Sequence, residues 1–254
     1  MTAPRTILIT GAAKGIGRAV AEDFAADAGN HLVLLDLDLA QLQAWVADFQ
    51  GLASIETHAA DIADLAGLRR LFDELGKRLG HVEVLVNSAG ICNENEPDDL
   101  DNWHRVISVN LNGTFYVTSL CLPLMPTQGR IINMASILGR AGKVRNSAYC
   151  ASKHGIVGMT KALAMDLASR QITVNAILPA WVDTPMLQQE LAVQASMSGQ
   201  SQEQILRTAK KKLPLRRFIQ SEEVAALTRY LASPEAGGFT AQSLVIDGGV
   251  GLGM

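Results

Sequence analysis

The stretch TILITGAAKGIG, residues 6–17, decides the fold. An apolar run, Ile7 to Ile9, leads directly into a glycine-rich turn, and a helical pattern begins at Arg18. Glycines at such a turn let the backbone approach a ligand closely, and the free N–H groups at the start of a helix attract phosphate. The stretch therefore predicts a strand, a loop and a helix that bind a pyrophosphate together. Glycines here also serve simply to pack a strand against a helix, which is the alternative.

Apolar runs of strand length recur along the chain and alternate with helical patterns. The strand-like runs are Ile7–Ile9, Leu32–Leu35, Val82–Val86, Ile131–Ile132, Ile172–Leu178 and Leu244–Ile246. The helical patterns cover Arg18–Ala28, Leu65–Leu79, Trp103–Leu120, Tyr149–Ala168 and Glu222–Leu231. Continuous apolar strands are typical of a parallel sheet covered on both faces, because each crossover between parallel strands adds a helix to one face. We therefore expect an α/β fold, a doubly wound parallel sheet with helices on both faces, of the Rossmann type.

The composition indicates one large domain without a nucleic-acid or membrane partner. The chain has 254 residues, 48% of them hydrophobic, and a formal net charge of −3, so residues 1–254 can form a single domain with no basic field for a phosphate backbone. The first apolar run is too short for a signal peptide or a membrane span. Cys92, Cys121 and Cys150 lie far apart, which favours reduced thiols and a cytoplasmic location.

One segment, residues 183–213, breaks the alternation of strands and helices. It carries Met186 and Met197 and ends in the basic run Lys210–Lys212. Insertions after the carboxyl end of a strand stand over the ligand crevice of an open α/β sheet. We predict a substrate lid here, and a surface helical hairpin of fixed structure is the alternative.

An acidic residue at the end of the second predicted strand points to the adenosine part of a dinucleotide. Asp36 lies about twenty residues past the glycines, where a carboxylate accepts hydrogen bonds from ribose hydroxyls. A 2′-phosphate would be repelled there, and the apolar Leu37 that follows offers it no partner. We therefore expect NAD rather than NADP, although Lys14 in the glycine loop is a potential partner for such a phosphate.

Two further strand ends complete the expected cofactor site. Asp61-Ile62 follows the third strand, where a carboxylate accepts from the adenine amino group. Asn87-Ser88-Ala89-Gly90 ends the fourth strand with small residues against the cofactor. An aspartate at a strand end also serves as the N-cap of the next helix, and this alternative stays open for Asp61.

Tyr149 and Lys153 are the residues expected to carry the chemistry. Four residues apart on a helix, their side chains lie on one face. A positive charge beside a phenol draws its pKa, about 10 unperturbed, toward working pH, so that the phenol can exchange a proton with an alcohol or ketone. Ser136, thirteen residues earlier, is expected to hold the substrate oxygen, and Asn110 to join a water chain that reaches Lys153. A local bond from Asn110 to a carbonyl is the ordinary alternative.

In order and spacing these motifs resemble the short-chain dehydrogenase/reductase family over nearly the whole chain. The matching positions are Thr10–Gly17, Asp36, Asp61, Asn87–Gly90, Asn110, Ser136, Tyr149, Lys153, Pro179–Thr184 and Asp247–Gly249. The resemblance implies that Ser136, Tyr149 and Lys153 perform the chemistry, that Asn110 completes a proton relay, and that Lys153 also bonds the nicotinamide ribose. Two positions depart from the family: Ser88 replaces the second Asn of the usual N-N-A-G turn, and Ala180 replaces the glycine after the proline.

The resemblance also implies a cofactor site and an assembly. The expected cofactor-binding residues are Gly11, Lys14, Gly15, Ile16, Gly17, Asp36, Asp61, Ile62, Asn87, Ala89, Gly90, Tyr149, Lys153, Pro179, Val182 and Thr184. At Ala180 the backbone needs an unstrained φ or a small displacement, so we expect a deviation where the nicotinamide carboxamide is seated. Relatives imply a homotetramer built through the helices near Trp103 and Tyr149 and through the last strand.

The substrate pocket is expected to follow the fourth, fifth and sixth strands. The expected substrate-binding residues are Cys92, Ser136, Leu138, Arg140, Trp181 and Met186. Arg140, Lys143 and Arg145 together would suit an acidic or thioester-linked substrate, unless they are solvated loop charges. Pro179–Pro185 resembles the 3-hydroxybutyrate dehydrogenases, whereas Leu138 and Cys92 replace a histidine and a substrate-binding glutamine of those enzymes.

The combined pattern predicts an NAD(P)-dependent oxidoreductase that transfers a hydride between nicotinamide and a secondary alcohol or ketone. A small 3-hydroxy acid or 3-hydroxyacyl compound is one expected substrate class, and a bulkier neutral cyclic or aromatic alcohol is the alternative. A dinucleotide-sensing regulator or a structural α/β subunit would not need Ser136, Tyr149, Lys153 and Asn110 together. The five histidines show no ligand spacing, so no metal site is predicted.

Overall fold

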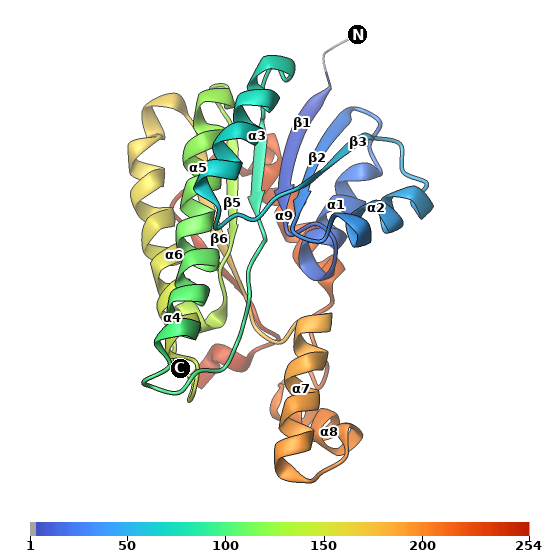
Figure 1. Cartoon of the computed structure of the whole chain (residues 1–254), viewed down its shortest axis with the longest axis vertical. Coiled ribbons are helices and arrows are strands. Elements are labelled where there is room, and N and C mark those ends of the chain that lie inside the picture. Colours follow the sequence, from blue (N-terminus) through green and yellow to red (C-terminus); the bar gives the residue numbers. More distant parts are fainter. Residues whose placement is uncertain (1–3, 254) are drawn as a thin grey trace.

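A parallel sheet of seven strands forms the centre of the molecule, in the order β3-β2-β1-β4-β5-β6-β7 (Figure 1). The computed structural model describes residues 4–253, apart from the side chains at positions 197, 212, 252 and 253. The strands are β1 (Arg5–Thr10), β2 (Asn30–Asp36), β3 (Ser54–Ala59), β4 (Val84–Asn87), β5 (Arg130–Met134), β6 (Thr173–Pro179) and β7 (Ser243–Ile246). All neighbouring pairs run parallel, which confirms the doubly wound topology.

Helices cover both faces of this sheet. The α-helices are α1 (Gly15–Ala25), α2 (Leu39–Asp48), α3 (Leu65–Arg78), α4 (Leu100–Ile107), α5 (Thr114–Cys121), α6 (Ser147–Asp166), α7 (Pro185–Ser198), α8 (Gln202–Lys212) and α9 (Ser221–Ala232). Figure 1 shows α1, α2 and α9 on one face and α3, α5 and α6 on the other. Short helical turns lie at Leu122–Leu124, Ile137–Gly139, Ala168–Arg170, Pro234–Ala236 and Val250–Gly253.

Two apolar cores explain why the central strands are continuously hydrophobic. On β1, Ile7 and Ile9 enter the core beneath α1 and α9, whereas Leu8 between them enters the core beneath α3 and α5. Successive strand residues face opposite sides of the sheet, so a strand with helices on both sides needs apolar residues at every position. All three side chains are fully buried.

The edge strand β3 differs from the other strands in composition. Its sequence, SIETHA, is mostly polar, and its side chains are half-buried or exposed. Glu56 in the middle of β3 pairs with Arg78 of α3, with nitrogen and oxygen 3.0 Å apart. An edge strand is less covered than a central one, which is why β3 shows no continuous apolar run.

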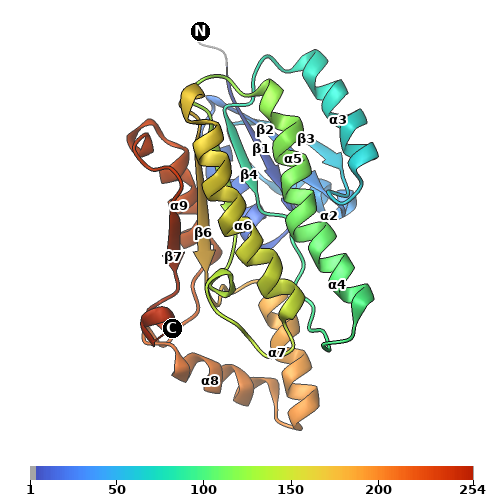
Figure 2. The ribbon, with the colours of Figure 1, turned by 90° about the vertical axis from the view of Figure 1, so that its left-hand side faces the viewer.

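The segment predicted as a lid forms the α7–α8 helical hairpin beyond the carboxyl ends of the strands (Figure 2). The side chain of Thr184 caps α7, and Ser201 with Gln204 forms a capping box at the start of α8. Leu187, Leu191, Leu213 and Phe218 form a small core under the hairpin. The side chains of Met197 and Lys212, named in the sequence analysis, lie outside the described residues. Among helices of residues 4–253, none is both long and apolar enough to cross a membrane.

Candidate active site

A pocket of about 280 Å³ opens at the carboxyl ends of the strands, below α7. Ser136 and Tyr149 lie in its wall beside the apolar side chains of Leu138, Trp181 and Met186. The pocket therefore combines two hydroxyl groups with mostly hydrophobic surface, at the edge of the sheet where open α/β folds bind ligands.

The glycine loop after β1 is packed too closely for a side chain at two of its glycines. Gly11 has φ +69°, and a Cβ there would lie 2.7 Å from the Cα of Ala89. At Gly17 a Cβ would lie 2.1 Å from the carbonyl oxygen of Gly11. Lys14 takes the N-cap position of α1 with an exposed side chain, and Gly15 and Ile16 open the first helical turn. The start of α1 thus presents backbone N–H groups at the surface of the crevice, as anion binding requires.

Asp36 ends β2 beside this loop. Its Oδ2 accepts a hydrogen bond of 2.8 Å from the backbone N–H of Ala13, and its Oδ1 accepts one of 3.0 Å from the N–H of Asp38. A carboxylate oxygen can accept two hydrogen bonds, and each oxygen of Asp36 accepts one from the backbone here. Lone pairs therefore remain for a diol that approaches from the crevice. Leu37 next to it is 74% exposed.

The structure changes the interpretation of three expected cofactor residues. Asp64, not Asp61, is the N-cap of α3, so the capping alternative for Asp61 is wrong; the Asp61 Oδ1 accepts from the N–H of Ala63. Ile62 is buried in the core, where it packs against Gly113. Asn87 is also buried, at 3% exposure, and its amide nitrogen is bonded inside the core.

The Asn87 amide instead belongs to a polar ladder inside the core. It donates to Thr118 of α5 at 3.0 Å and to the side-chain oxygen of Asn133 of β5 at 2.9 Å. Asn133 in turn donates to Thr160 of α6 at 2.9 Å. These side chains are 3% exposed or less, so the ladder ties α5 and α6 to the sheet through bonds that water does not weaken.

Tyr149 and Lys153 stand one turn apart on α6, as the sequence predicts. The Lys153 Nζ lies 5.4 Å from the centroid of the Tyr149 ring and donates to the carbonyl oxygen of Met134 at 2.8 Å. Burial lowers the pKa of Lys153 from its usual 10.5 to about 8. The ammonium is therefore held by a backbone carbonyl at the end of β5, directly beside the phenol.

The pKa of Tyr149 differs from the expectation. Burial raises it above the usual value of 10, with the neighbouring Cys92 acting in the same direction, while a hydrogen bond with Ser136 acts in the opposite direction. The lowering expected from Lys153 is therefore not found, because desolvation of the phenolate is the largest cause of the shift. The phenol of Tyr149 is protonated at neutral pH and is able to donate.

Asn110 lies in a π-helical segment, Ser108–Gly113, between α4 and α5. Its fully buried amide donates to the carbonyl oxygen of Ile91 at 2.9 Å and to Ser152 at 3.1 Å, and its Oδ1 accepts from the N–H of Ile91 at 2.8 Å. Gly90 leaves room for this contact, since a Cβ there would lie 3.2 Å from the Asn110 oxygen and 3.7 Å from the Lys153 Nζ. The side chain therefore fixes the loop after β4 next to Lys153, and π-segments of this kind are frequent at functional sites.

The remaining family positions border the same pocket. Pro179, Val182 and Thr184 line it together with Ile16, so the glycine loop and the end of β6 face one space. The backbone N–H of Ala180 donates to the carbonyl oxygen of Ile246 on β7 at 3.1 Å, and its φ is not positive. Alanine is therefore accommodated here without backbone strain.

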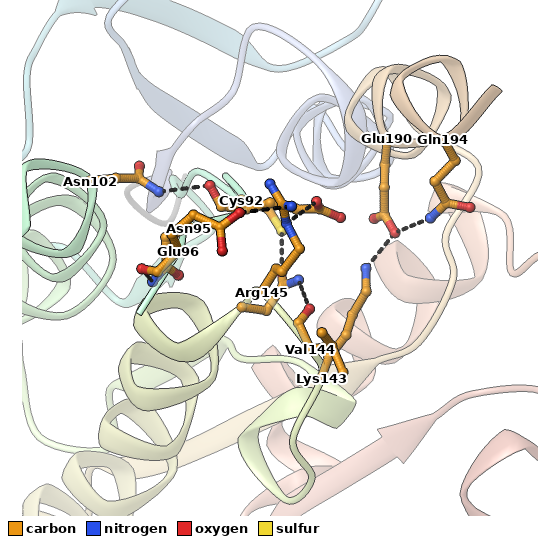
Figure 3. Close-up of polar contacts among 11 residues, drawn as sticks. Cys92, Asn95, Glu96, Asn102, Lys143, Val144, Arg145, Glu190 and Gln194 are labelled. Carbon is orange, nitrogen blue, oxygen red and sulfur yellow. Dashed lines mark hydrogen bonds and ion pairs between the residues drawn. The ribbon is translucent and has the colours of Figure 1, made fainter. Parts of the chain in front are cut away.

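The three basic residues before Tyr149 separate in the structure. The Arg140 guanidinium donates to the carbonyl oxygen of Ser243 at 2.7 Å and does not line the pocket, so its assignment to the substrate is corrected. Arg145 pairs with Glu94 and Glu96 on the loop after β4 (Figure 3). Lys143 does line the pocket, together with Glu190 of α7, which the sequence analysis missed. Glu190 lies one helical turn after Leu187, which also lines the pocket. This spacing was the available signal that Glu190 lies on the same face of α7.

Cys92 occupies the pocket wall as expected, and its thiol is partly buried. Burial raises the pKa of its thiol to about 11, and the Sγ donates to the side-chain oxygen of Asn146 at 3.7 Å. All three cysteines are free thiols. Within residues 4–253 no three His, Cys, Asp or Glu side chains gather in a way that could hold a metal ion.

Comparison with known proteins establishes the family. A family model described as enoyl-(acyl carrier protein) reductase matches residues 11–251. The chain belongs to the short-chain dehydrogenase/reductase family. It is 35% identical to a 3-oxoacyl-(acyl-carrier-protein) reductase of Thermotoga maritima, over 97% of each chain. It is 34% identical to a D-beta-hydroxybutyrate dehydrogenase of Rhizobium meliloti, over 96% of this chain and 98% of the relative.

A solved structure agrees with these relatives. A variant of actinorhodin polyketide ketoreductase, solved with NADPH, matches 98% of this short-chain dehydrogenase/reductase and 97% of its own chain, with 33% identity and a TM-score of 0.89. This protein is accordingly an oxidoreductase that acts on CH–OH groups, within a family that uses nicotinamide cofactors.

Proposed function

We propose that this enzyme interconverts a 3-oxoacyl and a 3-hydroxyacyl compound with a nicotinamide cofactor, and that Tyr149 is its acid and base. The observation that carries the proposal is the arrangement of Ser136 and Tyr149 in the pocket wall with the ammonium of Lys153 behind the phenol ring. The similarity to ketoacyl reductases and a hydroxybutyrate dehydrogenase supports the oxoacyl class.

In the direction of reduction the chain's own residues handle the proton. Ser136 holds the carbonyl oxygen of the substrate by a hydrogen bond, and Tyr149, kept protonated by burial, donates its proton to that oxygen. A bound nicotinamide would supply the hydride to the carbonyl carbon. Lys153 would stabilise the phenolate that remains and would hold the nicotinamide ribose. Asn110 holds the adjacent loop and would take part in the relay that returns a proton to Tyr149.

We infer NAD as the preferred cofactor. The residues present fit a dinucleotide: the first turn of α1 offers N–H groups to the pyrophosphate, and Asp36 keeps lone pairs for the adenosine ribose. The remaining residues of the proposed site are Gly11, Lys14, Gly15, Ile16, Gly17, Asp61, the backbone of Ile62, Asn87, Ala89, Gly90, Tyr149, Lys153, Pro179, Val182 and Thr184. A solved neighbour with NADPH makes the choice between the two dinucleotides a matter for measurement.

A second candidate substrate is a bulkier neutral cyclic or aromatic ketone. Leu138, Trp181 and Met186 form a largely apolar wall, and Trp181 packs at a tilt of 35° against Phe218 with ring centroids 6.0 Å apart. Such a wall suits a ring at least as well as a short acid.

Initial rates of NADH and NADPH oxidation test the proposal, with 3-oxo acids, their esters and thioesters, and cyclic and aromatic ketones as substrates. We expect 3-oxoacyl compounds with NADH to give the highest kcat/KM. Tyr149→Phe should reduce kcat by at least about 100-fold while NADH still binds, because only the acid and base is removed. A variant that keeps a tenth of the rate would contradict the role of Tyr149.

Two structural proposals accompany this function. The α7–α8 hairpin over the pocket is proposed to act as the substrate lid within one domain. A homotetramer is supported by large apolar side chains left exposed on α5, α6 and β7: Phe115, Met165 and Val245. A light-scattering mass near that of one chain would overturn the tetramer.

A further inference from the structure

An ion pair crosses the substrate pocket. Lys143 lies on the loop between β5 and α6, and Glu190 lies on α7 opposite (Figure 3). The Lys143 Nζ and the Glu190 Oε1 are 2.5 Å apart, and the same oxygen accepts a hydrogen bond of 3.2 Å from the Gln194 amide. Their side chains are 32% and 26% exposed, so solvent screens the pair only in part. The pair therefore joins the two walls of the pocket.

This pair contains all the charge that the described side chains lining the pocket contribute. Lys143 and Glu190 are the only acidic or basic residues among them. The neighbouring cations are occupied elsewhere, because Arg140 bonds a backbone carbonyl of β7 and Arg145 pairs with two glutamates of the loop after β4. The pocket wall therefore has a net charge of zero, and its one cation is already paired.

We propose that Glu190 makes the pocket select substrates whose carboxyl group is masked, as an ester or thioester, over free 3-oxo acids. The inference rests on the proposed oxoacyl function and names the substrate class within it. A free carboxylate beside Lys143 would have to displace Glu190 or lie next to it, and like charges at such separations repel. A masked carboxyl group carries no charge and meets neither penalty.

Apart from the hydroxyls of Ser136, Tyr149 and Thr184, the described side chains of the pocket wall offer a carboxylate little compensation, and none of them is a second cation. Leu138, Trp181 and Met186 are apolar where they face the pocket, and the Cys92 thiol stays neutral because burial raises its pKa to about 11. A carboxylate that gives up its water there loses hydrogen bonds that the wall does not replace. An ester or thioester loses far less.

The test compares 3-oxobutanoate with its methyl ester as the ratio of their kcat/KM values. A change in how far α7 opens alters kcat/KM for both substrates alike. The ratio of the two values therefore isolates the effect of charge. The wild-type enzyme should prefer the ester. Glu190→Gln keeps the size of the side chain and its oxygen for Gln194, but frees the charge of Lys143, and should raise the acid-to-ester ratio by about tenfold. Glu203→Gln on the exposed side of α8 is the matched control and should leave the ratio unchanged.

Lys143→Met separates this inference from its main competitor. If Glu190 is the discriminating group, this variant leaves its carboxylate unpaired and lowers the ratio further. A wild-type preference for the acid that disappears in Lys143→Met would identify Lys143 as a carboxylate ligand and overturn the inference, with the oxoacyl function intact. An unchanged ratio in Glu190→Gln would also overturn it. If the enzyme reduces cyclic or aromatic ketones but neither 3-oxobutanoate nor its methyl ester, the oxoacyl function itself is refuted. The inference about Glu190 is then refuted with it.

Discussion

Replacing Lys153 with methionine should make the protein more stable at neutral pH while it abolishes turnover. Burial lowers the pKa of Lys153 from 10.5 to about 8, and one pKa unit corresponds to about 1.36 kcal/mol, so the buried ammonium costs about 3 kcal/mol. Methionine avoids this cost but loses the hydrogen bond to the carbonyl oxygen of Met134, a loss of about 1.5 kcal/mol. The net gain of about 1.5 kcal/mol raises Tm by about 3–6 °C for a chain of this size.

The stability difference between the wild type and Lys153→Met should depend on pH, and its sign follows from the pKa of Lys153. Between pH 8 and pH 10.5 the unfolded chain binds more protons at position 153 than the folded chain, so wild-type stability at this site rises with pH. Below pH 8 the cost of the charge is present in full, and above pH 10.5 it is gone. The advantage of Lys153→Met should therefore shrink as pH rises and reverse at about pH 9.5, where the remaining cost of the charge equals the contribution of the hydrogen bond; at pH 10.5 the wild type should be the more stable protein.

Thermal unfolding of both proteins without cofactor, at pH 7, 9 and 10.5, measures this difference. Other titrating groups cancel because they are common to the two proteins. NADH oxidation at pH 7 confirms that the variant is inactive. A variant less stable than the wild type at pH 7, or a difference in Tm independent of pH, would refute the reasoning that desolvation dominates at Lys153.

Three further substitutions probe the site. Gly17→Ala should weaken NADH binding at least tenfold in a fluorescence titration, because its Cβ would lie 2.1 Å from a backbone oxygen of the same loop, whereas Gly80→Ala, with open space around it, should bind normally. Asn110→Ala should lower the free energy of unfolding by about 2–4 kcal/mol in urea, since the partly buried N–H and C=O of Ile91 lose their partner; a loss below 0.5 kcal/mol would contradict this. Arg140→Gln should keep kcat/KM within about twofold for acidic and neutral ketones, because its guanidinium bonds a carbonyl of β7, and a selective loss on acids would restore it to the pocket.

The fold class and the catalytic pair could be predicted from the sequence because both depend on local patterns. The apolar runs of β1, β4 and β6 reflect burial on both faces, and the spacing of Tyr149 and Lys153 corresponds to one helical turn. The polar edge strand β3 and the helix α2 have no such strong pattern. They form because β3 pairs with β2 at the edge of the sheet and α2 packs Leu42 and Trp45 into the core.

The pocket wall could be predicted only in part, because it depends on contacts between distant segments. Arg140, Lys143 and Arg145 lie within six positions of one another, yet they bond β7, α7 and the loop after β4 respectively. Nothing in the local sequence says which partner each cation meets. Likewise the pKa of Tyr149 follows from how deeply the fold buries it, which spacing alone does not reveal.

The polar ladder from Thr118 through Asn87 and Asn133 to Thr160 has a consequence for how such enzymes diversify. It anchors α6, and with it the reacting hydroxyl, from the side of the sheet interior. The surfaces proposed to recognise the substrate come instead from α7 and from the loop before α6, whose pocket-lining side chains take no part in this anchorage. A protein engineer can therefore exchange the recognition surfaces between relatives while the reaction machinery stays in register.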